Sequence, residues 1–312
     1  MKLYISALQL ENGELLLVVS PQFNANAIQD YALRWEIETL FSCLKGRGFN
    51  LENTRLTDPR RVKKLIAVLA ISFCWCYLTG EWQHDQKKAI KIKKHGRLSM
   101  SLFRYGLDYV QMAIQRLIGF GKKEEFKEIL AILRRQNLKW NKSHLKCFAL
   151  IMLVIILKQT CNLSSASKAL PIKCLPQSFY RRMQRFFAGQ YFDYRQISQL
   201  IFNMFSFDQV QLTLDRTNWK WGKRNINILM LAIVYRGIAI PILWTLLNKR
   251  GNSDTKERIA LIQRFIAIFG KDRIVNVFAD REFIGEQWFT WLIEQDINFC
   301  IRVKKTSLSP II

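Results

Sequence analysis

The amino-acid sequence predicts an α/β protein, in which a mixed sheet with flanking helices is joined to largely helical segments. Residues 209–303 alternate between short apolar runs with strand character and longer amphipathic stretches. Residues 29–199 show mainly helical periodicity. The chain has 312 residues, half of them hydrophobic, which is enough for a substantial core and for two or three domains.

The charge of the chain indicates a polyanionic partner. There are 48 lysines and arginines against 24 aspartates and glutamates, so the formal net charge is +24, spread over most of the sequence. Nucleic acid or an anionic membrane surface would attract such a protein. The two longest apolar runs, Leu65–Leu78 and Cys147–Leu157, are shorter than the roughly 20 residues of a membrane span. We therefore expect buried helices and no membrane partner.

The cysteines give no sign of a disulfide framework or a zinc site. All seven are scattered, none forms a Cys-x-x-Cys pair, and the three histidines lie far from any matching cysteine spacing. We expect reduced, structural thiols in a cytoplasmic protein. Residues 1–14 alternate and then become polar, so they do not resemble a signal peptide.

Two strand-like segments open the chain, and a helix follows them. Lys2–Leu10 and Leu15–Ser20 flank Asn12-Gly13, which is a strong hairpin signal. The stretch Gln29–Phe49 contains no proline and its first glycine is Gly46. We therefore expect one helix that ends near Gly46.

At about 100° per residue, this helix has two neighbouring faces, each about 60° wide. The apolar face contains Leu33, Ile37, Leu40 and Leu44, and the second face contains Tyr31, Arg34, Glu38 and Lys45. The apolar face suits a core. The second face is either a functional site or a solvated charged surface with chance spacing. Glu36 points about 160° away from Arg34 and cannot join the second face.

Further helices are expected up to residue 187. They are Arg60–Leu78, Leu102–Ile118, Lys123–Arg135, Asn141–Lys158, Ser164–Leu170 and Pro176–Phe187. Residues 86–97 are half lysine and arginine, which suits phosphate contacts or a solvated basic surface. The last helix carries Tyr180, Arg181, Arg182 and Arg185. The trio of helices that ends with it suits DNA binding, although small helical bundles with basic surfaces are common.

From residue 209 the periodicity changes to that of strands. Strands are expected at Gln209–Asn218, Asn225–Tyr235, Ile238–Leu247, Arg273–Ala279 and Asn298–Val303, with helices at Asp254–Phe269 and Gly285–Gln295. Three antiparallel strands followed by a helix, a strand, a helix and a strand is the order of a ribonuclease-H-like core.

Two carboxylates accompany the apolar strands of this core. Asp215 lies within one strand, and Asp280 directly follows another. A carboxylate there is costly unless it is paired, for which the adjacent arginines are candidates, or bound to a cation. Glu38 could supply a third carboxylate. Three carboxylates suit two Mg²⁺ ions, which stabilise the attacking and leaving oxygens of a phosphoryl transfer, while Arg34 and Lys45 would bind phosphates.

These residues together resemble the IS-four family of bacterial DDE transposases. Tyr31, Arg34, Glu38 and Lys45 match its Y-x(2)-R-x(3)-E-x(6)-K signature, and the motifs DRTNW at Asp215 and DREF at Asp280 look like its two aspartate motifs. The resemblance implies that Asp215, Asp280 and Glu38 form the catalytic triad and bind two Mg²⁺ ions, with Mn²⁺ able to substitute. It also implies that Tyr31, Arg34 and Lys45 contact DNA.

The activity implied by the resemblance is cut-and-paste transposition. The ends of the mobile element are hydrolysed, and the 3′-hydroxyl then attacks target DNA. The implied partners are double-stranded DNA, both terminal repeats and target, and a second copy of the chain in the DNA complex.

The order of the segments departs from the family, in which the Glu-bearing helix comes last. Here it comes first, so we expect two halves in permuted order, joined near Gln136-Asn137. Four parts are expected: 1–20, a hairpin remnant of a β insertion; 21–136, the Glu-bearing helix and a helical region; 137–205, the DNA-binding domain; and 206–312, the strands with both aspartates. Two alternatives stay open: an inactive protein that only binds DNA, and a nuclease without strand transfer.

Overall fold

The computed structural model describes residues 2–94, 96–119, 140–169 and 174–304. The chain forms two compact units, of which the first contains Met1–Phe41 and Phe205–Ile312 and the second contains Ser42–Met204. Two sequence-based expectations lie outside the described residues: the helix Lys123–Arg135 and the junction at Gln136-Asn137.

A mixed sheet forms the centre of the first unit. In the described residues it has seven strands in the order β1-β2-β7-β6-β3-β4-β5. They are β1 (Tyr4–Gln9), β2 (Leu15–Ser20), β3 (Val210–Trp221), β4 (Arg224–Tyr235), β5 (Ile238–Leu246), β6 (Ile274–Ala279) and β7 (Phe299–Val303). β6 pairs in parallel with β3 and β7, and the other pairs are antiparallel. The α/β class is confirmed, and the arrangement is consistent with a ribonuclease-H-like core.

The hairpin at the start of the chain extends this sheet. β1 and β2 pair from Tyr4↔Ser20 to Gln9↔Leu15 around a turn in which Gly13 has a φ of 81°. β2 then pairs with β7, with Leu17 opposite Val303. The hairpin was predicted from its alternation and its Asn-Gly turn, but no local pattern predicted its pairing with β7.

The helix that follows the hairpin is divided into three pieces. α1 (Ala27–Ala32) leads through the 3-10 turn Leu33–Trp35 into α2 (Glu36–Leu44). The backbone stays in the right-handed helical region at Ala32, Leu33 and Glu36, so the helical spacing of the side chains is nearly preserved. Ile37, Leu40 and Leu44 are buried as predicted, and Leu33 is half-buried.

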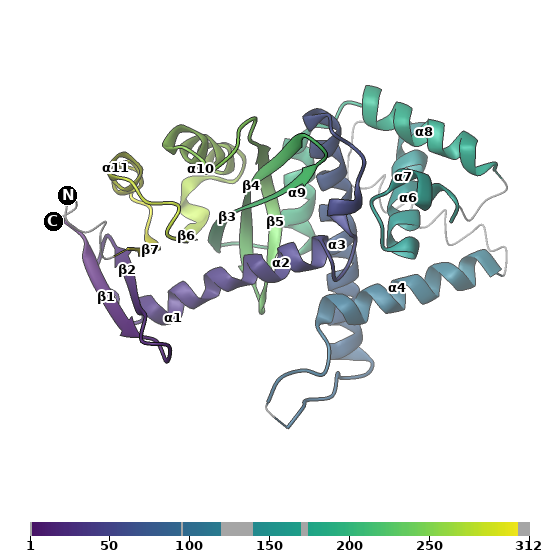
Figure 1. Ribbon diagram of the computed structural model, residues 1–312. Helices are drawn as coiled ribbons and strands as arrows, with labels where there is room; N and C mark the ends of the chain where they lie inside the picture. The colour runs from purple at the N-terminus through teal and green to yellow at the C-terminus, as the bar shows by residue number, and fades with distance from the viewer. Residues whose placement is uncertain (1, 95, 120–139, 170–173, 305–312) are drawn as a thin grey trace. The chain divides into compact units, whose positions relative to one another are not determined.

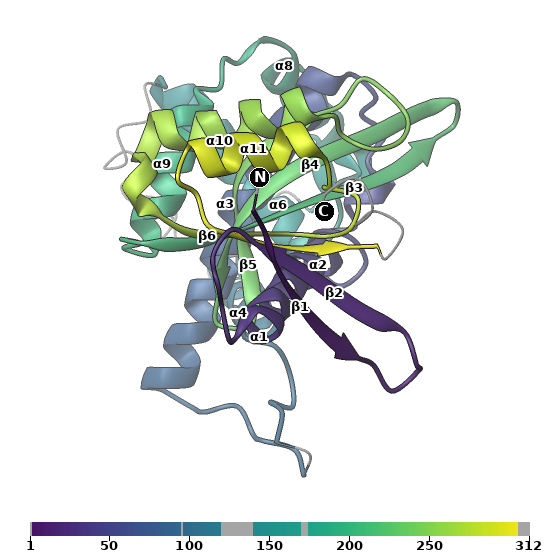
Figure 2. The ribbon, with the colours of Figure 1, turned by 90° about the vertical axis from the view of Figure 1, so that its left-hand side faces the viewer.

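Two further helices complete the first unit. α10 (Thr255–Phe269) begins with a capping box, in which Asp254 accepts from the Glu257 amide and Glu257 accepts from the Asp254 amide. α11 (Glu286–Glu294) packs against α10. Figure 2 shows α10 and α11 on one side of the sheet and α1 with α2 on the other. Tyr31 and Ala27 of α1 are buried against Phe278 of β6.

The second unit consists of helices in its described part. They are α3 (Pro59–Gln86), α4 (Leu102–Gly119), α6 (Lys142–Lys158), α7 (Leu163–Ser167), α8 (Pro176–Gly189) and α9 (Tyr194–Met204), labelled in Figure 1. Asp58 caps α3 as predicted, but α3 continues eight residues beyond the predicted end at Leu78. The sequence did not predict α9. By length and composition α3 could cross a membrane, but most of its apolar stretch is buried, as expected of a core helix.

α3 and α4 approach each other at two glycines, Gly80 and Gly106. A Cβ atom on Gly106 would collide with the backbone carbonyl oxygen of Cys76, and one on Gly80 would collide with that of Leu102. Backbone atoms of packed helices cannot yield as a flexible side chain can. The two helices can therefore pack this closely only with glycine at both positions.

Replacing Gly106 with alanine should destabilise the second unit. We expect Gly106→Ala to lower the free energy of unfolding by about 1–3 kcal/mol, because the methyl group forces the two helices apart. Urea denaturation followed by circular dichroism measures the loss. Gly189→Ala is the matched control, since a Cβ at that helical position meets no atom within 4 Å. Equal effects of the two changes would contradict the tight packing of α3 on α4.

Candidate active site

The sheet brings the two aspartates onto neighbouring strands. β3 and β6 pair in parallel with Leu214 opposite Ala279, so Asp215 and Asp280 occupy the next position on each chain segment. Because side chains alternate along a strand, both belong to the face that carries Phe278, against which α1 packs. The Asp215 side chain is 15% exposed. Its Oδ1 accepts a 2.6 Å hydrogen bond from the backbone N–H of Arg216.

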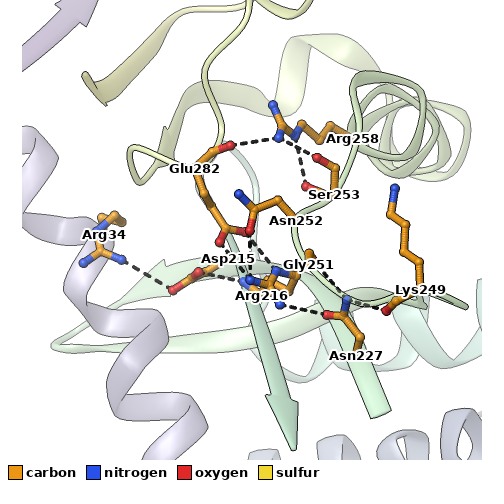
Figure 3. A network of polar contacts seen from close by, with 10 residues as sticks. All are labelled: Arg34, Asp215, Arg216, Asn227, Lys249, Gly251, Asn252, Ser253, Arg258 and Glu282. Atoms are coloured by element: carbon orange, nitrogen blue, oxygen red, sulfur yellow. Dashed lines mark hydrogen bonds and ion pairs between the residues drawn. The ribbon is translucent and has the colours of Figure 1, made fainter. Parts of the chain in front are cut away.

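Arg34 links the helical segment to the first aspartate. Its side chain is only 4% exposed, and its guanidinium lies 4.7 Å from the centre of the Trp35 ring. Nη2 is 2.7 Å from Oε1 of Glu38, one helical turn later. Nη1 is 3.4 Å from Oδ2 of Asp215, as Figure 3 shows. One buried guanidinium therefore connects two of the three predicted catalytic carboxylates.

Tyr31 links the same helical segment to the second aspartate. The residue is 2% exposed, and its hydroxyl donates a 3.2 Å hydrogen bond to Oδ1 of Asp280. The guanidinium of Arg34 lies 5.8 Å from the Tyr31 ring. Tyr31 and Arg34 are thus buried, so the hypothesis that this face is solvated with chance spacing is wrong for these two residues.

The fourth residue of the predicted signature has a different partner. Lys45 follows the end of α2, and its Nζ is 2.8 Å from Oε1 of Glu52, in the second unit. The predicted DNA-binding helix is α8, whose Phe179, Met183 and Phe186 are buried. Arg181 and Arg185 are exposed on it, and Tyr180 and Arg182 are half-buried. Nη2 of Arg182 donates to the backbone oxygen of Ser143 at 3.1 Å.

Burial and neighbouring charges shift the pKa values of the site. Burial raises the pKa of Asp215 to about 7; the Arg216 amide and Arg34 oppose this shift, while Glu282 and Asp280 add to it. Burial alone would lower the pKa of Arg34, but Tyr31, Glu38 and the two aspartates outweigh it and leave that pKa raised. Arg34 therefore stays protonated, and its positive charge is stabilised by the acidic groups around it.

A second arginine ties the two aspartate-bearing segments together. Arg216 directly follows Asp215, and Glu282 stands two residues after Asp280. Nε of Arg216 is 3.2 Å from Oε1 of Glu282, and Nη2 is 3.1 Å from Oε2, which is a two-pronged ion pair. The remaining contacts of Arg216, each 3.2 Å, are to Oδ1 of Asn227 and Oδ1 of Asn252 (Figure 3). The pair restrains the separation of the two segments.

Arg258 of α10 holds the segment after β6 in place. The residue is 4% exposed, and its guanidinium donates to the backbone oxygens of Ser253 (2.6 Å), Glu282 (2.8 Å) and Ile284 (3.1 Å). Buried arginine is expensive unless its donors are satisfied. Here they are satisfied by carbonyl groups of two loops, so α10 fixes the backbone that carries Asp280 and Glu282.

Glu36, which sequence reasoning left without a role, stabilises the β4–β5 turn. Its Oε2 accepts from the Tyr235 amide at 2.8 Å and its Oε1 from the Gly237 amide at 3.0 Å. Arg236 and Gly237 both have positive φ, as in a tight type I′ turn. Burial raises the pKa of Glu36, and the two backbone donors oppose that shift. Glu36 thus anchors α2 to the sheet.

The donor set of the site fits a hard divalent cation. Asp215, Asp280 and Glu38 offer only carboxylate oxygens, the ligands that Mg²⁺ prefers. Within the described ranges, no three acidic, histidine or cysteine side chains are close enough together to hold a metal ion as they stand. The guanidinium of Arg34 is the cation that lies between Glu38 and Asp215. A metal bound by all three carboxylates would therefore require movement of Arg34.

Comparison with known proteins assigns this arrangement to a family. A family model described as "Transposase DDE domain" matches residues 23–75 and 206–308, which together make half of the chain. The chain belongs to this family. The matched segments include the helix with Tyr31, Arg34 and Glu38 and both aspartates. No curated protein and no solved structure matches the chain in the same kind of comparison.

Sequence reasoning found five residues that the DDE domain brings together, but it missed the second arginine pair. Arg216 and Glu282 lie inside the motifs DRTNW and DREF, in which Arg216 was considered only as a partner of its neighbour Asp215 and Glu282 was given no role. Opposite charges one residue after the first aspartate and two residues after the second were the available signal. That signal becomes informative only once the parallel pairing of β3 and β6 is known.

The Arg216–Glu282 pair should show strong energetic coupling. We expect Arg216→Met and Glu282→Gln each to destabilise the DDE domain, because each leaves a largely buried partner uncompensated. The double variant should lose less than the sum, with a coupling energy of about 1–3 kcal/mol in a double-mutant cycle measured by urea denaturation. Additive losses would show that the two side chains do not interact as described.

The raised pKa of Asp215 predicts a pH-dependent stability of the metal-free DDE domain. Asp215 keeps its proton up to about pH 7 when folded and loses it near its usual value when unfolded. Its contribution is therefore fully present at low pH and is lost as the pH rises through 7. Asp215→Asn should remove this loss, so its advantage over wild type should grow by up to about 3 kcal/mol between pH 5 and pH 8.

Thermal unfolding in EDTA at the two pH values measures the effect. The exposed aspartate Asp272 provides the control, since Asp272→Asn should follow the wild-type pH dependence. An advantage of Asp215→Asn that is the same at pH 5 and pH 8 would contradict the shift.

Proposed function

We propose that this chain is the transposase of an insertion sequence, which cleaves DNA at the ends of the element and joins them to target DNA. The observation that supports this most strongly is the pair of contacts from one helical segment to both aspartates, Arg34 to Asp215 and Tyr31 to Asp280. Membership of the DDE family supplies the context, since transposases act on DNA. The excess of positive charge suits a DNA partner.

In this proposal Asp215, Asp280 and Glu38 are the catalytic triad and hold Mg²⁺, for which Mn²⁺ can substitute. Two bound ions would stabilise the attacking and leaving oxygens of an in-line displacement at phosphorus. Arg34 and Tyr31 lie beside the carboxylates, where their donors can bind phosphate oxygens of the DNA. Nε of Arg34 has no hydrogen-bond partner among the described residues, which lowers the cost of rearranging that side chain.

The other predicted DNA contacts extend the same proposal. Lys45 would bind a more distant phosphate, and Tyr180, Arg181, Arg182 and Arg185 would make the helical segment 137–205 a DNA-binding domain. The exposed arginines of α8 and its buried aromatic face are compatible with that role. Assembly of two copies on paired element ends would complete the complex.

At the finer level we propose an IS-four transposase whose two halves are permuted. The Glu-bearing helical segment precedes both aspartates in the chain, yet it contacts them. Arg34 is 181 positions from Asp215, and Tyr31 is 249 positions from Asp280. The pairing of β2 with β7 gives the start of the chain a place in the sheet of the DDE domain. These contacts support a permuted chain that can assemble its site. In this proposal residues 1–20 are the remnant of a β insertion, and divisions near residues 136 and 205 separate the other parts.

A cleavage assay on duplex DNA with the terminal repeats of the element tests this function. We expect Mg²⁺-dependent nicking and joined products from the wild type. Glu38→Gln and Asp280→Ala should lower the nicking rate at least about a hundredfold, because each removes a proposed metal ligand. Glu294→Gln changes an exposed glutamate of α11 and should leave the rate unchanged.

Each other outcome of the assay has a definite meaning. Wild-type activity no higher than that of Asp280→Ala would contradict the catalytic proposal, and binding of the repeats without cleavage would identify a protein that only binds DNA. Nicking without joined products would identify a nuclease that does not transfer strands.

A further inference from the structure

The hairpin of β3 and β4 extends beyond the rest of the sheet. The two strands pair as far as Trp221↔Arg224, whereas pairing with β5 reaches only Ile228 of β4. The residue pairs between Ile228 and the turn therefore form a two-stranded ribbon that projects from the first unit, as Figure 2 shows. The ribbon closes in a two-residue turn in which Gly222 has a φ of 56°, a conformation that glycine adopts at no steric cost.

The end of this ribbon is basic and contains an exposed aromatic ring. We call residues 220–224 the hairpin tip; Lys220, Trp221, Lys223 and Arg224 are exposed there, with 38% of Trp221 accessible. No aspartate or glutamate occurs between Arg216 and Ser253. Lys249, by contrast, pairs with Asp254 and Glu257, while no ion pair among the described residues involves the cations of the tip.

The tip presents part of this surface on the side of the sheet that carries the candidate active site. Side chains alternate along a strand, and Trp221 lies six residues after Asp215, so both belong to the same face. Arg224 pairs opposite Trp221 and shares that face. At about 3.3 Å per residue, the tip lies roughly 20 Å along the ribbon from Asp215. That distance corresponds to about six base pairs of duplex DNA, which rises about 3.4 Å per base pair.

We propose that the hairpin tip binds the DNA duplex held in the candidate active site, about six base pairs from the phosphate that is cleaved. Lys223 and Arg224 contact phosphates, and the Trp221 ring packs on the sugar-phosphate backbone beside them. These contacts do not depend on base sequence, because they use charge and an apolar ring rather than base edges. The position of the cut rests on the proposed function; the binding itself needs no metal ion.

The contribution of the charged side chains of the hairpin tip to DNA binding can be measured from the salt dependence of the affinity. Fluorescence anisotropy with a labelled duplex, in EDTA and at 50–200 mM KCl, gives the slope of log affinity against log salt concentration. Each phosphate contact contributes about 0.9 to that slope. Lys223→Gln combined with Arg224→Gln should therefore flatten the slope by about 1.8 and weaken binding about tenfold at the lowest salt.

A matched control removes the same charge elsewhere on the first unit. Lys256→Gln combined with Lys304→Gln changes two exposed lysines and should leave the slope within about 0.5 of wild type. Both double variants keep Gly222, and equal melting temperatures would show that each is folded. If the tip variant and the control have the same slope, the tip does not bind DNA.

The location of the contact requires a second comparison. Duplexes that extend either ten or four base pairs past the cleavage position, in both directions, should bind wild type with different affinities, the shorter one about tenfold more weakly. The tip variant should bind both equally. A wild type that binds no duplex would overturn the proposed function as well, whereas tight binding that the tip variant retains would overturn only the role of the tip.

Discussion

The buried guanidinium of Arg34 is the interaction on which the arrangement of the site depends. It carries a positive charge into a nearly solvent-free position between Glu38 and Asp215. An unpaired charge there would cost several kcal/mol, so the guanidinium and the carboxylates hold one another in place. The helical segment Ala27–Leu44 is thereby fixed against the sheet with its polar face toward the two aspartates. A surface ion pair of the same geometry would contribute far less to stability.

The acidic side chains around the sheet divide according to their partners. Glu282 is held by both prongs of Arg216, and Glu36 accepts two backbone amides at the β4–β5 turn. Both carboxylates use their two oxygens in contacts that hold segments of the first unit together. Asp215, Asp280 and Glu38 instead contact the Arg34 guanidinium or the Tyr31 hydroxyl, which are donors that can also bind other anions. Partner geometry, more than residue type, separates the acids that hold the framework from those for which we propose a catalytic role.

Much of this framework could be predicted from local sequence patterns. Strand alternation identified the segments that became β1 to β7, and helical periodicity placed Tyr31, Arg34 and Glu38 on one face even though a 3-10 turn interrupts the helix. Periodicity states which residues share a face but not what covers that face, so it could not show that Tyr31 and Arg34 are buried. Contacts between distant segments, such as Arg216 with Glu282 or β2 with β7, leave no local pattern. The partner of Lys45 was missed for a similar reason, whereas α9 was missed although Ile197, Leu200 and Ile201 follow helical spacing and are buried.

The pairing of β2 with β7 determines when the first unit can fold during synthesis on the ribosome. Leu17 is paired with Val303, which is synthesised 286 residues later. Tyr31 and Arg34 likewise have partners, Asp280 and Asp215, that are synthesised much later than they are. At synthesis rates of about 5–20 residues per second, the first helix emerges roughly 10–30 seconds before β3 exists. The second unit, made in between, can fold meanwhile from its own contacts. A nascent chain that has not yet reached Asp280 lacks one of the three carboxylates, so the site cannot form before that residue has been synthesised.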